Sequence, residues 1–146
     1  MPDLTPELLR KMLGMPPPNP EIAATRVIAS GCAEGLQCDD LRLGARDLPA
    51  TCLRPRKPGG LGILYCHAHG NRPEIDRAEL TDGRPALCDP PLGLALAQAG
   101  ATVLCADMPG FGTRQAEGSE GALVKSALWQ GRTLLGDMLS DLDCAH

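Results

Sequence analysis

The sequence predicts an α/β domain in which antiparallel strands are followed by a parallel strand–helix–strand crossover and a long helix. Two continuous apolar segments, residues 61–66 and 101–106, are typical of strands that are covered on both faces of a parallel sheet. The helical segment between them can connect the two strands in a right-handed crossover. Three shorter extended segments come before them and suit the edge of the same sheet.

A short amphipathic helix is expected near the N-terminus. Thr5 can cap its first turn, a proline follows at the first helical position, and Gly14 can end it. The proline-rich segment 15–20 is a stiff extended connector. The sequence therefore predicts an N-terminal helical arm and a proline-rich linker over residues 1–20, joined to a partial domain over residues 21–146.

The three extended segments suit an antiparallel meander. They cover residues 26–30, 38–43 and 48–54, and turn-forming residues separate the first two. Pro55 follows the third segment and starts a loop that is rich in glycine and proline. The meander is therefore expected to lie beside the parallel strands.

Two helices are expected in the second half of the chain. The crossover helix covers residues 92–99, with Asp89 as its cap, prolines in its first turn and Gly100 after its end. The last segment, from about residue 120 to residue 146, is expected to form one long helix. Its apolar side would consist of Leu128, Leu135, Met138 and Leu142.

The composition of the chain argues against some classes of function. The net charge of −4 and the aromatic content of 2% argue against a nucleic-acid partner. The chain shows no secretory signal and no apolar run long enough for a membrane span, so a cytoplasmic protein is expected. Seven scattered cysteines are then expected to be reduced and mostly buried. The charged residues between positions 72 and 79 are expected to form a solvated loop.

The loops after the two parallel strands are the candidate site, because open α/β sheets bind ligands at the carboxyl ends of their strands. They cover residues 66–72 and 107–112. In the first loop, Gly70 lets the backbone turn sharply and aims the next N–H into the cleft. Such an N–H can stabilise the negatively charged oxygen of a tetrahedral intermediate.

The order of these motifs resembles the α/β-hydrolase fold, and within it the dienelactone hydrolase and acetyl xylan esterase-like branches. The resemblance rests on an apolar strand followed by His69-Gly70, a short helix, and a second apolar strand that ends in Asp107-Met108-Pro109-Gly110-Phe111-Gly112. It covers about residues 25 to 146. It implies that the chain is the N-terminal half of an α/β-hydrolase sheet, truncated before the nucleophile strand.

The resemblance also implies roles for individual residues. Asn71 would supply the oxyanion-hole N–H, Gly70 would allow the turn, and His69 would shape it. The pocket rim would be formed by His67, Arg72 and Asp107, although Asp107 is expected mainly to hold its loop by hydrogen bonds. No cofactor and no metal is expected.

The nucleophile that this family requires is missing from the sequence. None of the four serines lies in the Gly-x-Ser-x-Gly elbow of such enzymes. We therefore expect a partial serine-hydrolase-type esterase for small acyl esters, inactive alone. The alternative is a non-catalytic remnant of the fold that acts as an interaction module. A thiol or metal protein that uses Cys66 with His67 or His69 is a third option.

Truncation has a physical consequence for the predicted sheet. The strand 61–66 would be unpaired on one side, and an apolar strand with an open edge invites pairing with another chain. The sequence therefore predicts self-association through this strand.

Overall fold

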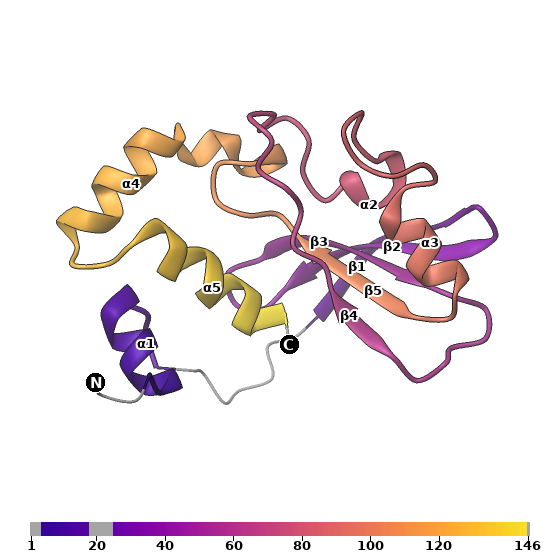
Figure 1. The fold of residues 1–146 in the computed structure, drawn as a ribbon, viewed down its shortest axis with the longest axis horizontal. Coiled ribbons are helices and arrows are strands. Elements are labelled where there is room, and N and C mark those ends of the chain that lie inside the picture. Colours follow the sequence, from indigo (N-terminus) through magenta and orange to yellow (C-terminus); the bar gives the residue numbers. More distant parts are fainter. Residues whose placement is uncertain (1–3, 18–24, 146) are drawn as a thin grey trace.

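A computed structural model describes residues 4–17 and 25–145 and contains a five-stranded sheet in the order β1-β2-β3-β5-β4 (Figure 1). The strands are β1 (Thr25–Ala33), β2 (Leu36–Leu43), β3 (Leu48–Arg54), β4 (Gly62–Leu64) and β5 (Thr102–Ala106). The helices are α1 (Pro6–Leu13), α2 (Glu79–Asp82), α3 (Leu92–Gln98), the 3-10 helix η1 (Gly112–Glu117), α4 (Glu120–Trp129) and α5 (Leu134–Ala145). Among the described residues, no helix is long and apolar enough to cross a membrane.

The predicted strand directions are confirmed. Strands β1, β2 and β3 form an antiparallel meander, and β3 pairs with β5 in the antiparallel direction. Strands β4 and β5 run parallel, with Leu64 beside Leu104. The N–H of Tyr65 continues this pairing by donating to the carbonyl oxygen of Leu104 at 2.7 Å. The carboxyl ends of β4 and β5 therefore lie at the same edge of the sheet.

The expectation that strand 61–66 is covered on both faces was wrong. Strand β4 has only three residues, lies at the end of the sheet and is largely exposed, and 60% of Leu61 before it is accessible to solvent. Leu61 and Tyr65 bond to β5, so the intervening even-numbered residues direct their backbone groups to the open side. A continuous apolar segment indicates that a strand is covered by other polypeptide when the protein is complete. It does not indicate that the described residues provide this cover.

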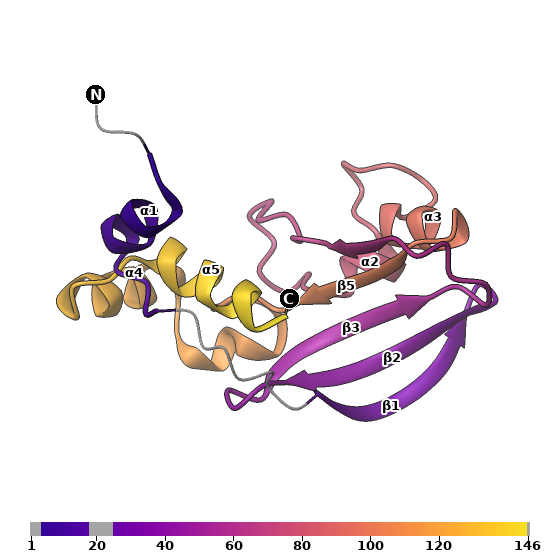
Figure 2. The ribbon, with the colours of Figure 1, turned by 90° about the horizontal axis from the view of Figure 1, so that it is seen from below.

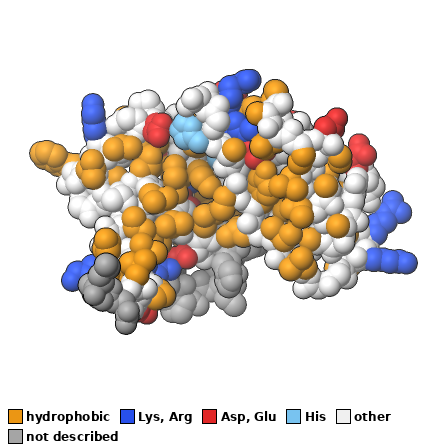
Figure 3. Space-filling model, in the orientation of Figure 1, with side chains coloured by type: hydrophobic (Ala, Val, Ile, Leu, Met, Phe, Trp, Pro, Cys, Tyr) orange, Lys and Arg blue, Asp and Glu red, His pale blue; other side chains and the backbone are white. Residues whose placement is uncertain are grey.

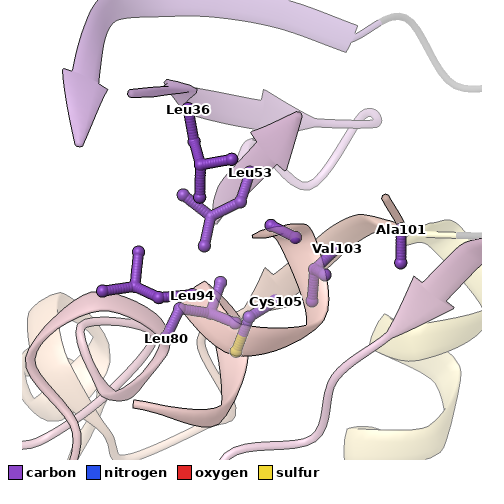
Figure 4. Packing of buried hydrophobic residues seen from close by; sticks show 8 residues of the cluster. Leu36, Leu53, Leu80, Leu94, Ala101, Val103 and Cys105 are labelled. Atoms are coloured by element: carbon purple, nitrogen blue, oxygen red, sulfur yellow. The ribbon is translucent and has the colours of Figure 1, made fainter. Parts of the chain in front are cut away.

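The core has one cluster on each face of the sheet. On the first face, Leu80 of α2 and Leu94 of α3 pack against Leu53, Val103 and Cys105 of the strands (Figure 4). Figure 2 shows strands β1 to β3 curving away beneath β5, with α3 above. The second cluster is built mainly from aliphatic side chains of β2 and β3, with Ala106 of β5. These two layers fix the ends of β4 and β5 where the candidate site lies.

The N-terminal helix forms as predicted. The Thr5 hydroxyl accepts the N–H of Leu8 at 3.2 Å, and Gly14 ends the helix in the left-handed conformation with a φ of 65°. Part of the predicted linker, residues 18–20, lies outside the described residues. The arm contacts α5 through the carbonyl oxygen of Leu13, which accepts the N–H and the hydroxyl of Thr133.

The C-terminal segment is two helices and not the single long helix that was predicted. Gly131 adopts a φ of 71°, which ends α4, and the Thr133 hydroxyl accepts the N–H of Gly136 at 2.9 Å, which caps α5. The apolar residues keep their helical spacing across the break between α4 and α5. Because the two helices are separate, these residues do not form one buried face. Leu128 and Leu135 are both exposed.

The start of the crossover helix also differs from the prediction. Helix α3 begins at Leu92, and Pro91 occupies the N-cap position without a side-chain cap hydrogen bond. Asp89 therefore does not cap this helix. Its first hydrogen bond comes from the N–H of Ala95 to the carbonyl oxygen of Pro91.

Candidate active site

The two loops that follow β4 and β5 are bonded to each other. His67 is buried beneath them, and its Nε2 accepts the N–H of Met108 at 3.2 Å. The ring of Phe111 lies between the two histidines, with centroid distances of 4.9 Å to His67 and 5.3 Å to His69. The structure thus brings His67, His69 and the Asp107 loop together at the edge of the sheet. His67 is a buried link between the loops and not an exposed rim residue.

Residues 69–72 form a tight turn at the exposed surface of this edge. Gly70 and Asn71 have φ values of 52° and 51°, and the N–H of Arg72 donates to the carbonyl oxygen of His69 at 3.2 Å. Two successive residues with positive φ are the geometry of a type I′ turn, which glycine adopts without steric cost. Glycine at position 70 therefore suits the first left-handed position of this turn.

The Asn71 N–H already has a partner in this structure. It donates to Nδ1 of His69 at 3.2 Å. Since Nδ1 accepts, Nε2 of the same ring carries the proton and donates to Oε2 of Glu120 in α4 at 3.2 Å. The amide can bind another acceptor only when the His69 ring turns away.

A buried ion pair holds the turn from behind. Glu79 is 1% exposed and accepts the hydroxyl of Tyr65 at 2.7 Å and the N–H of Ala68 at 3.2 Å. The buried guanidinium of Arg84 donates to Glu79 and to the carbonyl oxygen of Ala68. A Cβ at Gly70 would lie 2.7 Å from Nη1 of Arg84, so any larger residue there requires the turn or this guanidinium to shift. Glu79 was expected in a solvated loop, and that expectation was wrong.

The surroundings of Glu79 set its charge and that of Tyr65. Burial acts to raise the pKa of Glu79, but hydrogen bonds from Tyr65, Arg84 and the Ala68 amide hold it below its ordinary value. Burial and the hydrogen bond to Glu79 raise the pKa of Tyr65. Glu79 therefore remains a carboxylate acceptor and Tyr65 a hydroxyl donor.

Asp107 holds the second loop. It is buried, and it accepts the backbone N–H of Arg77 at 3.1 Å, the guanidinium of the same residue, and the hydroxyl of Thr113 at 3.2 Å. Burial raises its pKa, and the charge of Arg77 acts in the opposite direction. With these partners Asp107 is held inside its loop and away from the open rim. Arg77, like Glu79, is not part of a solvated loop.

A backbone hydrogen bond also joins the loop after β4 to the loop after β5. The N–H of Gly112 donates to the carbonyl oxygen of Pro73 at 2.9 Å. Gly112 has a φ of 49°, and any Cβ there would overlap the side chain of Asp76. Glycine is therefore required at this position for the loops to meet.

The side chains of the remaining predicted residues take no part in these contacts. Arg72 is exposed and pairs with Glu74. Cys66 is exposed, contrary to the expectation of a buried thiol, whereas Cys105 is buried and burial raises its pKa to about 12. Over the described residues, no group of three or more metal-ligating side chains is placed to hold an ion. Among the described residues, no hydrogen bond joins the Cys66 thiol to either histidine ring.

His67 predicts a pH dependence of stability. Burial lowers its pKa below the ordinary value of about 6.5, and its hydrogen bond from Met108 requires an unprotonated Nε2. The unfolded chain therefore takes up this proton at a higher pH than the folded chain, so the free energy of unfolding should fall as the pH drops below about 6.5. Urea unfolding between about pH 7.5 and pH 5.5 measures this slope. The slope should persist in His69→Gln and flatten in His67→Gln, and an equal slope in both variants would contradict the assignment.

Comparison with known proteins supports the fold. No protein-family profile matches the chain. Over 100 residues, 67% of this chain, it is 31% identical to the protein named "Putative hydrolase YtaP" of Bacillus subtilis strain 168, of which it covers 33%. A crystal structure of a putative acetyl xylan esterase from Bacteroides fragilis NCTC 9343 superposes with a TM-score of 0.67 at 18% identity, covering 94% of this chain and 39% of that one.

These similarities define the class of the fold. It is a hydrolase-like α/β fold whose sheet and helices match those of an esterase-like structure. The chain spans about a third of the length of the curated relative that it matches.

Proposed function

We propose that the chain forms one side of the active site of a serine-type ester hydrolase, with residues 69–72 as its oxyanion-binding turn. The observation that carries this proposal is the pair of left-handed residues Gly70 and Asn71 at the carboxyl end of β4, where open α/β sheets bind their ligands. The names of the similar proteins, a hydrolase and an acetyl xylan esterase, agree with this chemistry. The substrate class is a small acyl ester.

In this proposal the Asn71 N–H stabilises the oxygen that becomes negative when the ester carbonyl is attacked. A single donor of this kind contributes about 3 kcal/mol to transition-state stabilisation. Its present partner, Nδ1 of His69, would give way to the oxyanion, because the His69 side chain is half-exposed and can rotate. The Glu79–Arg84 pair would keep the turn in place while the ring moves.

We propose that the nucleophile, the acid and the base come from polypeptide outside these 146 residues. The serines of this chain are poorly suited to attack. Ser119 caps α4, Ser140 is buried in α5, and Ser30 donates to Asp39 in the sheet, while Ser126 accepts from Gln130 on α4. The chain's coverage of only 33% and 39% of its two relatives is consistent with a site completed elsewhere.

Labelling with a serine-reactive probe tests the proposal. The 146-residue chain should not react with a fluorophosphonate and should not hydrolyse nitrophenyl acetate. A longer polypeptide that carries these residues together with a Gly-x-Ser-x-Gly strand should do both. Ester turnover by this chain that is lost on changing one of its own serines would contradict the proposal. A longer polypeptide without labelling or turnover would instead favour the non-catalytic interaction module.

We also propose that the completing polypeptide adds a strand to the open edge of β4. On the face of the molecule shown in Figure 3, exposed apolar side chains gather over β4 and α3 and again over α4 and α5. The exposed large apolar side chains in or next to β4, α4 and α5 are Leu61, Leu64, Leu128, Leu135 and Trp129, the last 93% exposed. A patch of this kind on the same face as an open strand edge is typical of an interface.

Without that partner, the chain should self-associate through the same edge. Gel filtration at several concentrations should give an elution volume that decreases as concentration rises. Leu61→Lys places a charge beside β4 and should shift the equilibrium toward monomer. Leu87→Lys makes the same change at an exposed leucine in another loop and should not. A concentration-independent monomer of the unsubstituted chain would contradict the proposed edge.

A further inference from the structure

The His69 ring covers the backbone donor on which the proposed function depends. Its Nδ1 accepts the Asn71 N–H at 3.2 Å, and its Nε2 donates to Oε2 of Glu120 at 3.2 Å. The ring of Phe111 packs against it at an interplanar angle of 81°. Both nitrogens of the ring are therefore engaged. An oxyanion would have to displace the ring, because a backbone amide has only one hydrogen to donate.

The three groups form a chain of hydrogen bonds from amide to imidazole to carboxylate. Successive hydrogen bonds of this kind polarise one another. A carboxylate that accepts from one nitrogen of an imidazole makes the other nitrogen a better acceptor. Glu120 therefore strengthens the bond between the Asn71 N–H and His69, and it does so through the ring.

The start of α4 places Glu120 beside the candidate site. The Ser119 hydroxyl caps the helix by accepting the N–H of Ala122 at 3.4 Å. A Cβ at Gly110 would lie 3.1 Å from Cδ1 of Leu123, so the first turn of α4 packs closely against the loop after β5. These contacts hold the first turn of α4 where Glu120 reaches the His69 ring.

The contact between His69 and Glu120 can open without disturbing the core. Their side chains are 50% and 64% exposed, whereas the Glu79–Arg84 pair behind the turn is buried. Rotation of the His69 side chain would free the Asn71 N–H while the buried pair still holds the turn. Exposed contacts of this kind contribute little to stability, so the open state is accessible as well as the closed one.

We propose that Glu120 is a latch that holds the His69 ring over the Asn71 N–H and keeps the oxyanion-binding turn closed until the ring rotates. This inference rests on the proposed function, in which that N–H binds the oxyanion. Glu120 acts through His69, so it is a positioning residue and not a catalytic one. When the closed state predominates, turnover is reduced in proportion to the open fraction. Removing the latch should raise the open fraction about two- to fivefold.

Solvent exchange of the Asn71 amide, measured by NMR on the ¹⁵N-labelled chain at fixed pH, tests the latch without an assay of activity. Glu120→Ala should speed this exchange about two- to fivefold, and His69→Ala should speed it at least as much. Glu120→Gln keeps an acceptor oxygen and should have a smaller effect than Glu120→Ala. In the His69→Ala background, Glu120→Ala should have no further effect, because its action runs through the ring.

The matched control is Glu7→Ala, which removes an acidic side chain from the first turn of α1. It should leave the exchange of the Asn71 amide unchanged. Circular dichroism would confirm that each variant is folded. An exchange rate in Glu120→Ala equal to that of the unsubstituted chain would overturn the latch.

Activity separates the latch from the proposed function. In a longer polypeptide that turns over nitrophenyl acetate, Glu120→Ala should raise kcat about two- to fivefold, and only when His69 is present. Faster amide exchange with kcat unchanged or lowered would overturn the inhibitory role of the latch. Absence of turnover in the unsubstituted longer polypeptide would instead contradict the proposed function. Amide exchange in the 146-residue chain would still decide whether Glu120 controls access to the Asn71 N–H.

Discussion

Replacing Arg84 with methionine should lower the free energy of unfolding by about 3–5 kcal/mol, because it leaves the carboxylate of Glu79 buried without its counter-charge. Methionine keeps much of the volume of the side chain, so the loss reports the charge and its hydrogen bonds rather than a cavity. The carbonyl oxygen of Ala68 would lose a donor as well. Urea unfolding monitored by circular dichroism measures the change.

The matched control is Arg72→Met, which removes an exposed pair with Glu74 and should cost less than about 1 kcal/mol. Adding Glu79→Gln to Arg84→Met removes the uncompensated charge, so the double variant should be more stable than Arg84→Met alone. Equal losses in Arg72→Met and Arg84→Met would show that the buried pair does not hold the loop.

Elements specified by local chemistry could be predicted from the sequence. The cap at Thr5 and the stop at Gly14 depend on a few neighbouring residues, and both form as expected. The parallel direction of β4 and β5 follows from an intervening helix that must cross over the sheet. The antiparallel meander also matches, and β3 occupies the predicted residues 48–54.

Features that depend on distant partners could not be predicted in the same way. Glu74 and Glu79 lie in the same charged stretch, yet one is exposed and the other buried, because only Glu79 meets Tyr65 and Arg84. No local pattern separates the two. The break between α4 and α5 at Gly131 also depends on a distant part of the chain. Thr133, beside this break, bonds to Leu13 of the N-terminal arm.

The candidate site was predicted at the level of its loops but not of its contacts. The position of a His-Gly turn after an apolar strand indicated residues 69–72, and the structure puts this turn beside the Asp107 loop. The bond between the Asn71 N–H and the ring of His69 could not be anticipated, because it depends on a side-chain rotation that α4 favours through Glu120. The proposed donor is therefore occupied in the resting structure.

In a longer polypeptide that turns over nitrophenyl acetate, Gly70→Ala should lower kcat by about a hundredfold. The added Cβ would lie 2.7 Å from Nη1 of Arg84 and would be strained at a φ of 52°. We expect the turn to relax this strain by shifting, and the Asn71 N–H to move with it. A displaced N–H donor stabilises the transition state less, while the binding of the ground-state ester changes little. KM should therefore change little.

Gly121→Ala is the matched control, since a Cβ there meets nothing within 4 Å and the residue lies inside α4. It should keep full activity and stability, because alanine favours helix more than glycine does. Circular dichroism would confirm that Gly70→Ala remains folded at the assay temperature. If folded Gly70→Ala kept kcat within about threefold of the unsubstituted enzyme, the position of the turn would contribute little to transition-state stabilisation. The oxyanion would then have to be stabilised by groups other than the Asn71 amide.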